Sequence, residues 1–368
     1  MSKAAELAAL IGSQTALSNR NLIINGAMQV AQRGTSVSSF SSEGYASLDR
    51  WKLIGANFGT WTVSQSTDVP SGQGFGYSMK LDCTSADTSI GADDSLRLRQ
   101  GIEGQNVQSL AKGTSGAKSV TFSFWVKSNK TGTYGFEFRD QDNTRHNCRT
   151  YTIDSANTWE KKTLTFPGDT SGALDNDNAM SLQPQWFLIA GSNLTSGTAQ
   201  TTWGSVVAAN RAVGHNVNLA DSTSNEWYIC GVQMEIGEQA TPFEHRSFAD
   251  ELKQCERYYE KTYEYGTAPG TSEAYDTNIG MRINGLDDET SGQRYMVFRL
   301  RTEKRARPTN TYYGHLGGSG KISTADTGGT FTERNVGLSI TSTSMVGGGP
   351  SNGAYAGLAL YVVSDAEL

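Results

Sequence analysis

Residues 119–127 read SVTFSFWVK and carry the clearest strand signal in the chain. Four apolar side chains alternate along the segment: Val120, Phe122, Phe124 and Val126. Successive side chains of a β-strand point to opposite faces, so this set predicts a core face. The intervening residues predict a wetter face, on which Trp125 is the large aromatic residue. We expect the ring of Trp125 to reach the surface.

Other segments of the same kind surround this strand, at 77–83, 96–100, 133–139, 158–166 and 226–236. Turn-rich sequence separates them, for example AKGTSGAK at 111–118. Many short strands divided by Gly, Ser, Asn and Asp turns are typical of an antiparallel sandwich or jelly roll. We therefore predict an all-β protein whose residues 21–246 form a jelly-roll-like antiparallel β-sandwich.

The composition agrees with a β-rich, turn-rich chain. The 368 residues include 41 Gly, 39 Ser and 38 Thr, whereas charged residues make up only 18%. Ordinary soluble domains carry roughly 25% charged residues. Aromatic residues at 10% supply enough apolar mass to exclude a disordered chain, and the few charges exclude a coiled coil.

One helix is predicted at about 247–261, after the sandwich. Ser247 and Asp250 fit the S-x-x-D start signal, in which the hydroxyl caps the first turn. Apolar residues then recur at helical spacing: Phe248, Leu252, Cys255 and Tyr259. We therefore predict a linking helix within 247–265 and a smaller C-terminal β domain at 266–368.

A short N-terminal helix is predicted at residues 3–11, with Leu7, Leu10 and Ile11 on one face. Isolated helices shorter than about 12–15 residues are marginal in water, so this one needs a partner. We expect residues 1–20 to serve in attachment or trimerisation. The alternative is a frayed terminus.

Charge and hydropathy exclude two kinds of partner. The net charge is −6 and the pI is near 5.4, so no broad basic field exists to bind a nucleic acid backbone. The longest apolar runs are WFLIA and LALYVV, far shorter than the roughly 20 residues of a membrane span. We also find no signal peptide in the first residues. A virion component released by host lysis would reconcile this with the extracellular character of the composition, as would leaderless secretion.

No sequence motif nominates a catalytic, cofactor or metal site. GGSGK at 317–321 lacks the spacing of a phosphate-binding loop, and no G-x-S-x-G or HExxH motif is present. The four cysteines form no CxxC pair, and three of them lie at predicted core positions: Cys83, Cys230 and Cys255. A calcium-binding turn at DNDN, 175–178, remains an alternative to a plain turn. We expect a protein that is not an enzyme and that binds no cofactor.

Several aromatic residues near polar or Gly-rich loops could bind sugars. An exposed ring stacks on the apolar C–H face of a sugar, and neighbouring polar groups fix its orientation. The candidates are Trp125, Trp203, Tyr312, Tyr313 and Tyr355. For each of them the alternative is a core position.

Five stretches together resemble tail fibre and related receptor-recognition proteins of tailed bacteriophages. They are NLIINGAMQVAQRGTS at 21–36, YASLDRW at 45–51, the strand–ATPFE–helix junction at 227–261, RARPT at 305–309 and YVVSDAEL at 361–368. The resemblance implies a trimeric virion fibre that attaches to the tail through its N-terminus. It also implies structural roles for Arg50, Trp51, Pro242, Phe243 and Arg246, and it conveys no catalytic residue.

The leading hypothesis is a non-enzymatic phage tail fibre that recognises a host-surface glycan or an outer-membrane receptor. Such a protein would be made in the host cytoplasm, assemble as a homotrimer with phage tail proteins and leave by lysis. It would contact neither nucleic acid nor the membrane interior. The alternatives are a purely structural virion component, such as a connector or capsid decoration, and a polysaccharide depolymerase, which the lack of a fixed-period repeat disfavours.

Overall fold

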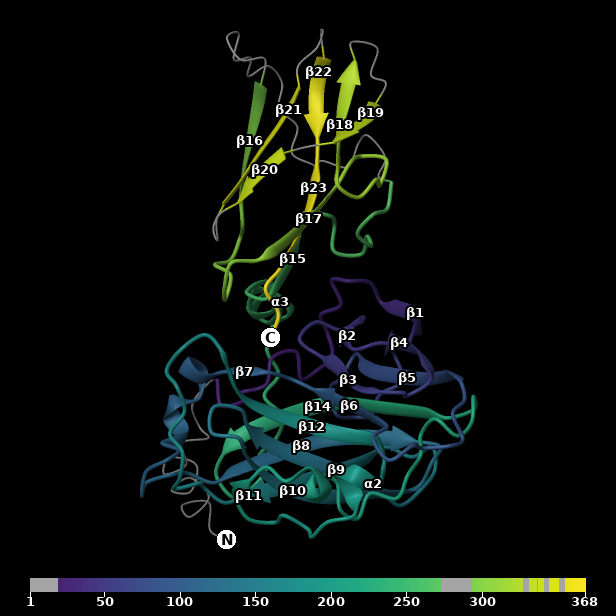
Figure 1. The fold of residues 1–368 in the computed structure, drawn as a ribbon, viewed down its shortest axis with the longest axis vertical. Helices are drawn as coiled ribbons and strands as arrows, with labels where there is room; N and C mark the ends of the chain where they lie inside the picture. Colours follow the sequence, from purple (N-terminus) through teal and green to yellow (C-terminus); the bar gives the residue numbers. More distant parts are fainter. Residues whose placement is uncertain (1–18, 273–292, 327–330, 336, 341–343, 351–354) are drawn as a thin grey trace. The chain divides into compact units, whose positions relative to one another are not determined.

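The computed structural model describes residues 19–272, 293–326, 331–335, 337–340, 344–350 and 355–368 (Figure 1). The chain divides into two compact units. The sandwich unit contains Met1–Ala31, Ser36–Glu251 and Leu368. The C-terminal unit contains Gln32–Thr35 and Leu252–Glu367.

The first sheet of the sandwich unit has six antiparallel strands. Their spatial order is β1 (Ser36–Phe40), β4 (Thr60–Ser66), β5 (Ser78–Ser85), β14 (Glu226–Ile236), β8 (Val120–Ser128) and β11 (Glu160–Phe166). Strand β8 contains the predicted stretch, and its Phe122 and Phe124 are fully buried whereas Trp125 is half-buried. The alternation predicted for this strand is therefore confirmed.

The second sheet has eight strands. Seven of them follow the order β13 (Gly204–Ser205), β10 (Arg145–Ile153), β9 (Gly132–Asp140), β12 (Met180–Ala190), β6 (Ser95–Arg99), β3 (Lys52–Ala56) and β2 (Gly44–Tyr45). The eighth, β7 (Ile102–Glu103), pairs with β12. The chain passes repeatedly from one sheet to the other, as in a jelly roll.

Aromatic side chains from both sheets form the core between them. Phe122 of β8 lies 5.0 Å from Phe136 of β9, measured between ring centroids. Phe124 lies 5.6 Å from Trp186 of β12 in an edge-to-face contact. Such pairs stabilise a core beyond the free energy of area burial alone. The prediction of an all-β antiparallel sandwich is confirmed.

A bulge corrects the alternation expected along β14. Tyr228 pairs with Lys127, whereas Met234 pairs with Phe122, and these two partners lie on opposite faces of β8. Tyr228 and Met234 therefore also face opposite ways, although a strict two-residue period would place them together. The change of phase occurs at Gly231, whose φ of +59° lies in the left-handed region that glycine tolerates.

The predicted linking helix is shorter in the structure. Helix α3 (Phe248–Glu256) begins as expected, with the Asp250 amide donating to Ser247 Oγ at 3.2 Å. It ends before Tyr259, which belongs instead to strand β15 (Tyr259–Lys261) and pairs with Asp365. The prediction that the helix continues to residue 261 is therefore wrong, because the backbone of Tyr259 is used in a sheet.

The described residues of the C-terminal unit form three small antiparallel sheets. Their orders are β15–β23–β17, β16–β21–β20 and β19–β18–β22, with bounds β16 (Gln293–Arg299), β17 (Thr309–Tyr313), β18 (Lys321–Asp326), β19 (Phe331–Asn335), β20 (Gly337–Ile340), β21 (Ser344–Pro350), β22 (Tyr355–Ala359) and β23 (Tyr361–Asp365). Strand β20 contains the sequence GLSI. The segment 357–363 is divided between β22 and β23.

Among the residues that the structure describes, the other helical elements are short and lie in the sandwich unit. They are α2 (Ser192–Thr195) and the 3-10 turns Gly104–Asn106, Gln108–Leu110 and Ala208–Asn210. Within the described part of the chain, no helix is long and apolar enough to cross a membrane. All four cysteines are buried as free thiols. The predicted N-terminal helix, with Leu7, Leu10 and Ile11, lies outside the described residues.

Candidate functional site

A pocket of about 480 Å³ opens on the outer face of the six-stranded sheet, and Trp125 lines it. Ser123 on the same strand and Lys161 on β11 share this face, because Lys161 lies directly opposite Trp125 in the pairing register. Loops add three rings, those of Phe75, Phe243 and His245. We call this site the Trp125 pocket.

The three loop rings form a compact cluster beside Trp125. Phe75 lies 5.0 Å from Phe243 and 5.2 Å from His245, and the latter two are 4.9 Å apart. Gly231 makes room for this cluster, since a Cβ at that position would lie 2.4 Å from the Phe75 ring. The bulge in β14 thus builds one wall of the Trp125 pocket.

A second aromatic surface continues along the same face. Trp159 packs edge-to-face on Tyr228 at 6.1 Å, and the ammonium group of Lys127 lies 4.4 Å from the Tyr228 ring. The Trp159 indole N–H donates to Asp68 at 2.9 Å, and Lys127 forms an ion pair with the same carboxylate. Burial alone would raise the pKa of Asp68, but these contacts lower it. Trp159 is therefore held rigidly in a half-buried position.

The outer face of the eight-stranded sheet is rich in arginine, and the glutamines among these arginines, Gln183 and Gln185, are buried. Register places Arg99 opposite Gln185, and Arg139 opposite Gln183. Arg97 Nη1 donates to Gln185 Oε1 at 3.0 Å, and Arg99 Nη1 donates to Gln183 Oε1 at 2.9 Å. We call the surface formed by these five residues the arginine face.

A buried ion pair lies beside the arginine face. Arg211 donates to both carboxylate oxygens of Glu137, with its Nη2 2.7 Å from Oε2, and His146 Nδ1 lies 2.9 Å from Oε1. Burial alone would raise the pKa of Glu137, but the hydrogen bond with His146 and the charge of Arg211 lower it to about 2. Glu137, His146 and Cys148 are close enough to hold a metal ion, but Arg211 already engages the carboxylate. The geometry is that of an ion pair.

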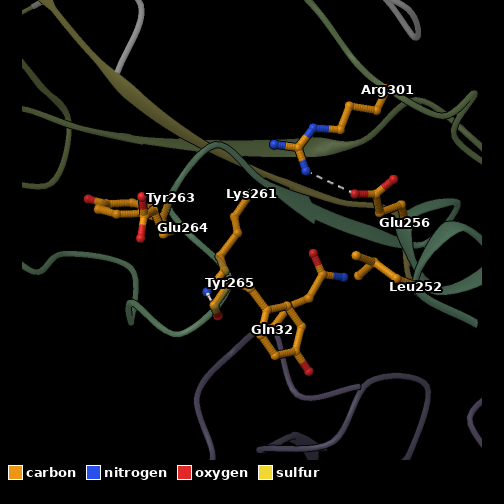
Figure 2. A pocket seen from close by; sticks show the side chains of 8 residues that line it. All are labelled: Gln32, Leu252, Glu256, Lys261, Tyr263, Glu264, Tyr265 and Arg301. Carbon is orange, nitrogen blue, oxygen red and sulfur yellow. Dashed lines mark hydrogen bonds and ion pairs between the residues drawn. The ribbon is translucent and has the colours of Figure 1, made fainter. Parts of the chain in front are cut away.

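A smaller pocket of about 220 Å³ lies within the C-terminal unit, lined in part by Gln32, Lys261 and Arg301 (Figure 2). Its charged groups are largely engaged by the protein itself. Arg301 pairs with Glu256 at 3.1 Å, and Lys261 Nζ donates to the Tyr265 and Thr267 carbonyls at 2.7 and 2.6 Å. These contacts leave few donors to orient a ligand, so the Trp125 pocket is the better candidate.

The remaining predicted aromatic residues differ in their surroundings. Trp203 donates from its indole N–H to the Pro167 carbonyl at 2.8 Å and packs on Phe138, which is a structural role. Tyr312 and Tyr313 are both half-buried on β17, and Tyr313 packs edge-to-face on Tyr263. Tyr355 begins β22, but its side chain lies outside the described residues. Trp203 is not among the residues that line the Trp125 pocket.

Two of the quoted sequence stretches meet in one hydrogen-bond network. The Glu244 carboxylate, from the ATPFEHR segment, accepts the backbone N–H groups of Asn19, Arg20 and Asn21. Arg246 donates to the backbone carbonyls of Asn21 and Ile23. This network joins the start of the sandwich to its exit.

Further polar contacts extend the network around the entry loop. The Asn25 side chain donates to the carbonyls of Val30 and Asp49, at 2.8 and 3.0 Å. The Trp51 indole N–H donates to the Asn25 carbonyl, and Arg50 donates to the Gly101 carbonyl at 2.6 Å. Arg50 and Trp51 are both fully buried. These residues act in building the sandwich.

Sequence reasoning identified Trp125 but missed its ring partners. Phe75 lies in a loop with no strand period, so nothing local signalled it. Phe243 and His245 lie within the strand–ATPFE–helix junction at 227–261, and the resemblance implies only a structural role for Phe243. Trp159 precedes β11 within the predicted strand 158–166, where alternation alone could have paired it with the outer face.

No family model matches the chain, and no curated protein matches it. The enzymatically active domain of bacteriophage CBA120 tailspike protein 4 is 14% identical, with a TM-score of 0.32, over 59% of this chain and 22% of that one. This chain thus spans about a fifth of that tailspike structure. A CBM4 structure is 12% identical, with a TM-score of 0.30, over 58% and 98% of the two chains.

A family 11 carbohydrate-binding module from Clostridium thermocellum, in complex with a β-1,3-1,4-mixed-linked tetrasaccharide, is also similar. It is 13% identical, with a TM-score of 0.28, over 56% of this chain and 99% of that one. All three TM-scores lie below 0.5.

Proposed function

We propose that the protein is a non-enzymatic tail fibre of a tailed bacteriophage and that its sandwich unit binds a host-surface saccharide in the Trp125 pocket. The observation that carries the binding role is the half-buried Trp125 ring, set on a sheet beside three clustered rings and the polar groups of Ser123 and Lys161. A flat ring offers the apolar contact that a sugar needs, and the polar groups fix its orientation.

The assignment to a phage rests on the sequence resemblance. Its support in the structure is the network in which Glu244 and Arg246 bind the backbone around Asn21. Two stretches that carry the resemblance are far apart in sequence but are hydrogen-bonded to one another. The same ATPFEHR segment supplies Phe243 and His245 to the Trp125 pocket.

Replacing Trp125 with alanine is expected to abolish most saccharide binding. A central aromatic anchor contributes about 2 kcal/mol or more, so affinity should fall by roughly 30-fold. A glycan array with the full-length protein would first identify a ligand, and titration calorimetry would then compare wild type with Trp125→Ala. Incubation with the same glycan should release no new reducing ends, whereas their appearance would favour a depolymerase.

Tyr312→Ala is the matched variant, since it removes an aromatic ring of similar exposure from the C-terminal unit. It should leave the affinity for that glycan unchanged. If Tyr312→Ala removed binding while Trp125→Ala did not, the receptor site would lie in the C-terminal unit and the Trp125 pocket would not be the site.

A trimer is the expected state of the full-length protein. Mass photometry should give three times the chain mass of 39.6 kDa, because a fibre of this kind presents several copies of its binding unit. A stable monomer at micromolar concentration would contradict the fibre assignment. Labelled protein should map to the tail of intact particles, and a capsid location would indicate a decoration instead.

A further inference from the structure

The arginine face gathers cations without an equal number of anions. Its three guanidinium groups, those of Arg97, Arg99 and Arg139, lie near a fourth, that of Arg211, since Arg97 and Arg211 both donate to Gln185. Glu137 is fully buried and already engaged by Arg211 and His146. The face is thus locally positive in a chain whose net charge is −6.

Burial and mutual repulsion lower the pKa values of these arginines. Burial and then the neighbouring charge of Arg211 lower the pKa of Arg97 to about 10. Burial also lowers the pKa of Arg99 and of Arg139, with a smaller contribution from the neighbouring arginines. The carboxylate of Glu137 opposes this lowering for Arg97 and Arg139, and that of Glu43, which is exposed at the sheet edge, opposes it for Arg97 and Arg99. Like charges held together by a rigid sheet raise the free energy of the empty face.

Each of the three arginines also retains hydrogen-bonding capacity. Nε of Arg97, of Arg99 and of Arg139 is buried and has no hydrogen-bond partner among the described residues. A buried N–H donor without a partner destabilises the folded state. The glutamine oxygens on β12 meanwhile fix Arg97 and Arg99 through one nitrogen each, so both planar groups are held in place.

We propose that the arginine face binds an oxyanion presented by an acidic saccharide, such as the carboxylate of a uronic acid. A guanidinium group matches a planar carboxylate with two parallel N–H donors, and such charge-assisted bonds are about twice as strong as neutral ones. This site lies on the opposite sheet from the Trp125 pocket. Only the saccharide part of the inference rests on the proposed function.

The test uses titration calorimetry of the full-length protein with trigalacturonate, neutral galactotriose and inorganic phosphate. Trigalacturonate should bind, and its affinity should fall as NaCl is raised because surface charges are screened. Arg139→Gln should weaken that binding by about 10-fold or more, since hydrogen bonds to charged groups contribute strongly. Lys253→Gln removes one exposed positive charge elsewhere and should leave the affinity unchanged.

A second variant and the phosphate titration test the arginine site and its preference for saccharide separately. Arg139→Lys keeps the charge but loses the planar fork, so it should also weaken binding, and it serves if Arg139→Gln does not fold. No binding of trigalacturonate by the wild type, or equal losses in Arg139→Gln and Lys253→Gln, would overturn the site. Phosphate binding as tightly as trigalacturonate would overturn its saccharide part.

Trp125→Ala distinguishes this site from the Trp125 pocket. It should retain trigalacturonate binding if the arginine face is the site. Loss of trigalacturonate binding in Trp125→Ala, with retention in Arg139→Gln, would overturn the arginine face and leave the proposed function intact.

Discussion

Replacing Arg211 with methionine is expected to lower the free energy of unfolding by about 3–5 kcal/mol. The methionine keeps much of the apolar stem but removes the forked donor that engages both oxygens of Glu137. Glu137 is fully buried, so its carboxylate would lose its cationic partner while remaining out of water. Urea unfolding at pH 7 measures the change directly.

Two further variants test the physical reason. The double variant Arg211→Met with Glu137→Gln should recover most of the loss, because removing both charges leaves no buried ion without a partner. Arg145→Met is the matched control. Its partner Asp169 keeps a second cation, Lys112, at 3.0 Å, so the expected cost is at most about 1 kcal/mol. If Arg145→Met and Arg211→Met lowered the free energy of unfolding equally, the buried carboxylate of Glu137 would not be the cause of the loss.

Local sequence pattern was sufficient for most strands of the sandwich. The predicted segment 226–236 coincides with β14, because a stretch rich in apolar residues lies there between two turn-rich segments. The bulge at Gly231 was not predicted, since the phase of one strand depends on the register of its neighbour β8. A glycine within a strand pattern is consistent with a bulge but does not require one.

The end of helix α3 also could not be predicted from the local sequence pattern. Tyr259 continues the apolar spacing of α3, so the sequence favours a longer helix there. Its backbone instead pairs with Asp365 of β23, a residue far away in sequence. Only this long-range pairing, absent from any local window, ends the helix at Glu256.

The sites were predictable only where one strand carries them. Trp125 follows from the alternation within β8, and the arginines of β6 alternate with Leu96 and Leu98, which are buried. A short stretch of sequence does not show that Arg139 of β9 is separated from β6 only by β12. Nor does it show that loops bring Phe75 and Phe243 together. Strand order determines both groupings, and strand order is a property of the whole fold.

Acid is expected to destabilise the sandwich unit through His215. The backbone N–H of Gly135 can only donate, so His215 Nδ1 accepts at 3.1 Å and Nε2–H donates to the Val217 carbonyl at 2.7 Å. Both ring nitrogens are thus satisfied in the neutral form. Burial lowers the pKa of His215 from its usual 6.5 to about 4, although the hydrogen bond to Val217 opposes the shift.

The sign follows from linkage between proton binding and folding. The unfolded chain binds a proton at this residue below about pH 6.5, whereas the folded chain resists it until about pH 4. The contribution of His215 is therefore complete above pH 6.5 and is lost as the pH falls to 4, by about 3 kcal/mol in all. His215→Asn should be less stable at pH 7 but should lack this part of the slope. Urea unfolding between pH 4 and pH 7 measures both curves, with His245→Asn as the control for losing one histidine. Parallel curves for wild type and His215→Asn would show that His215 does not cause the acid sensitivity.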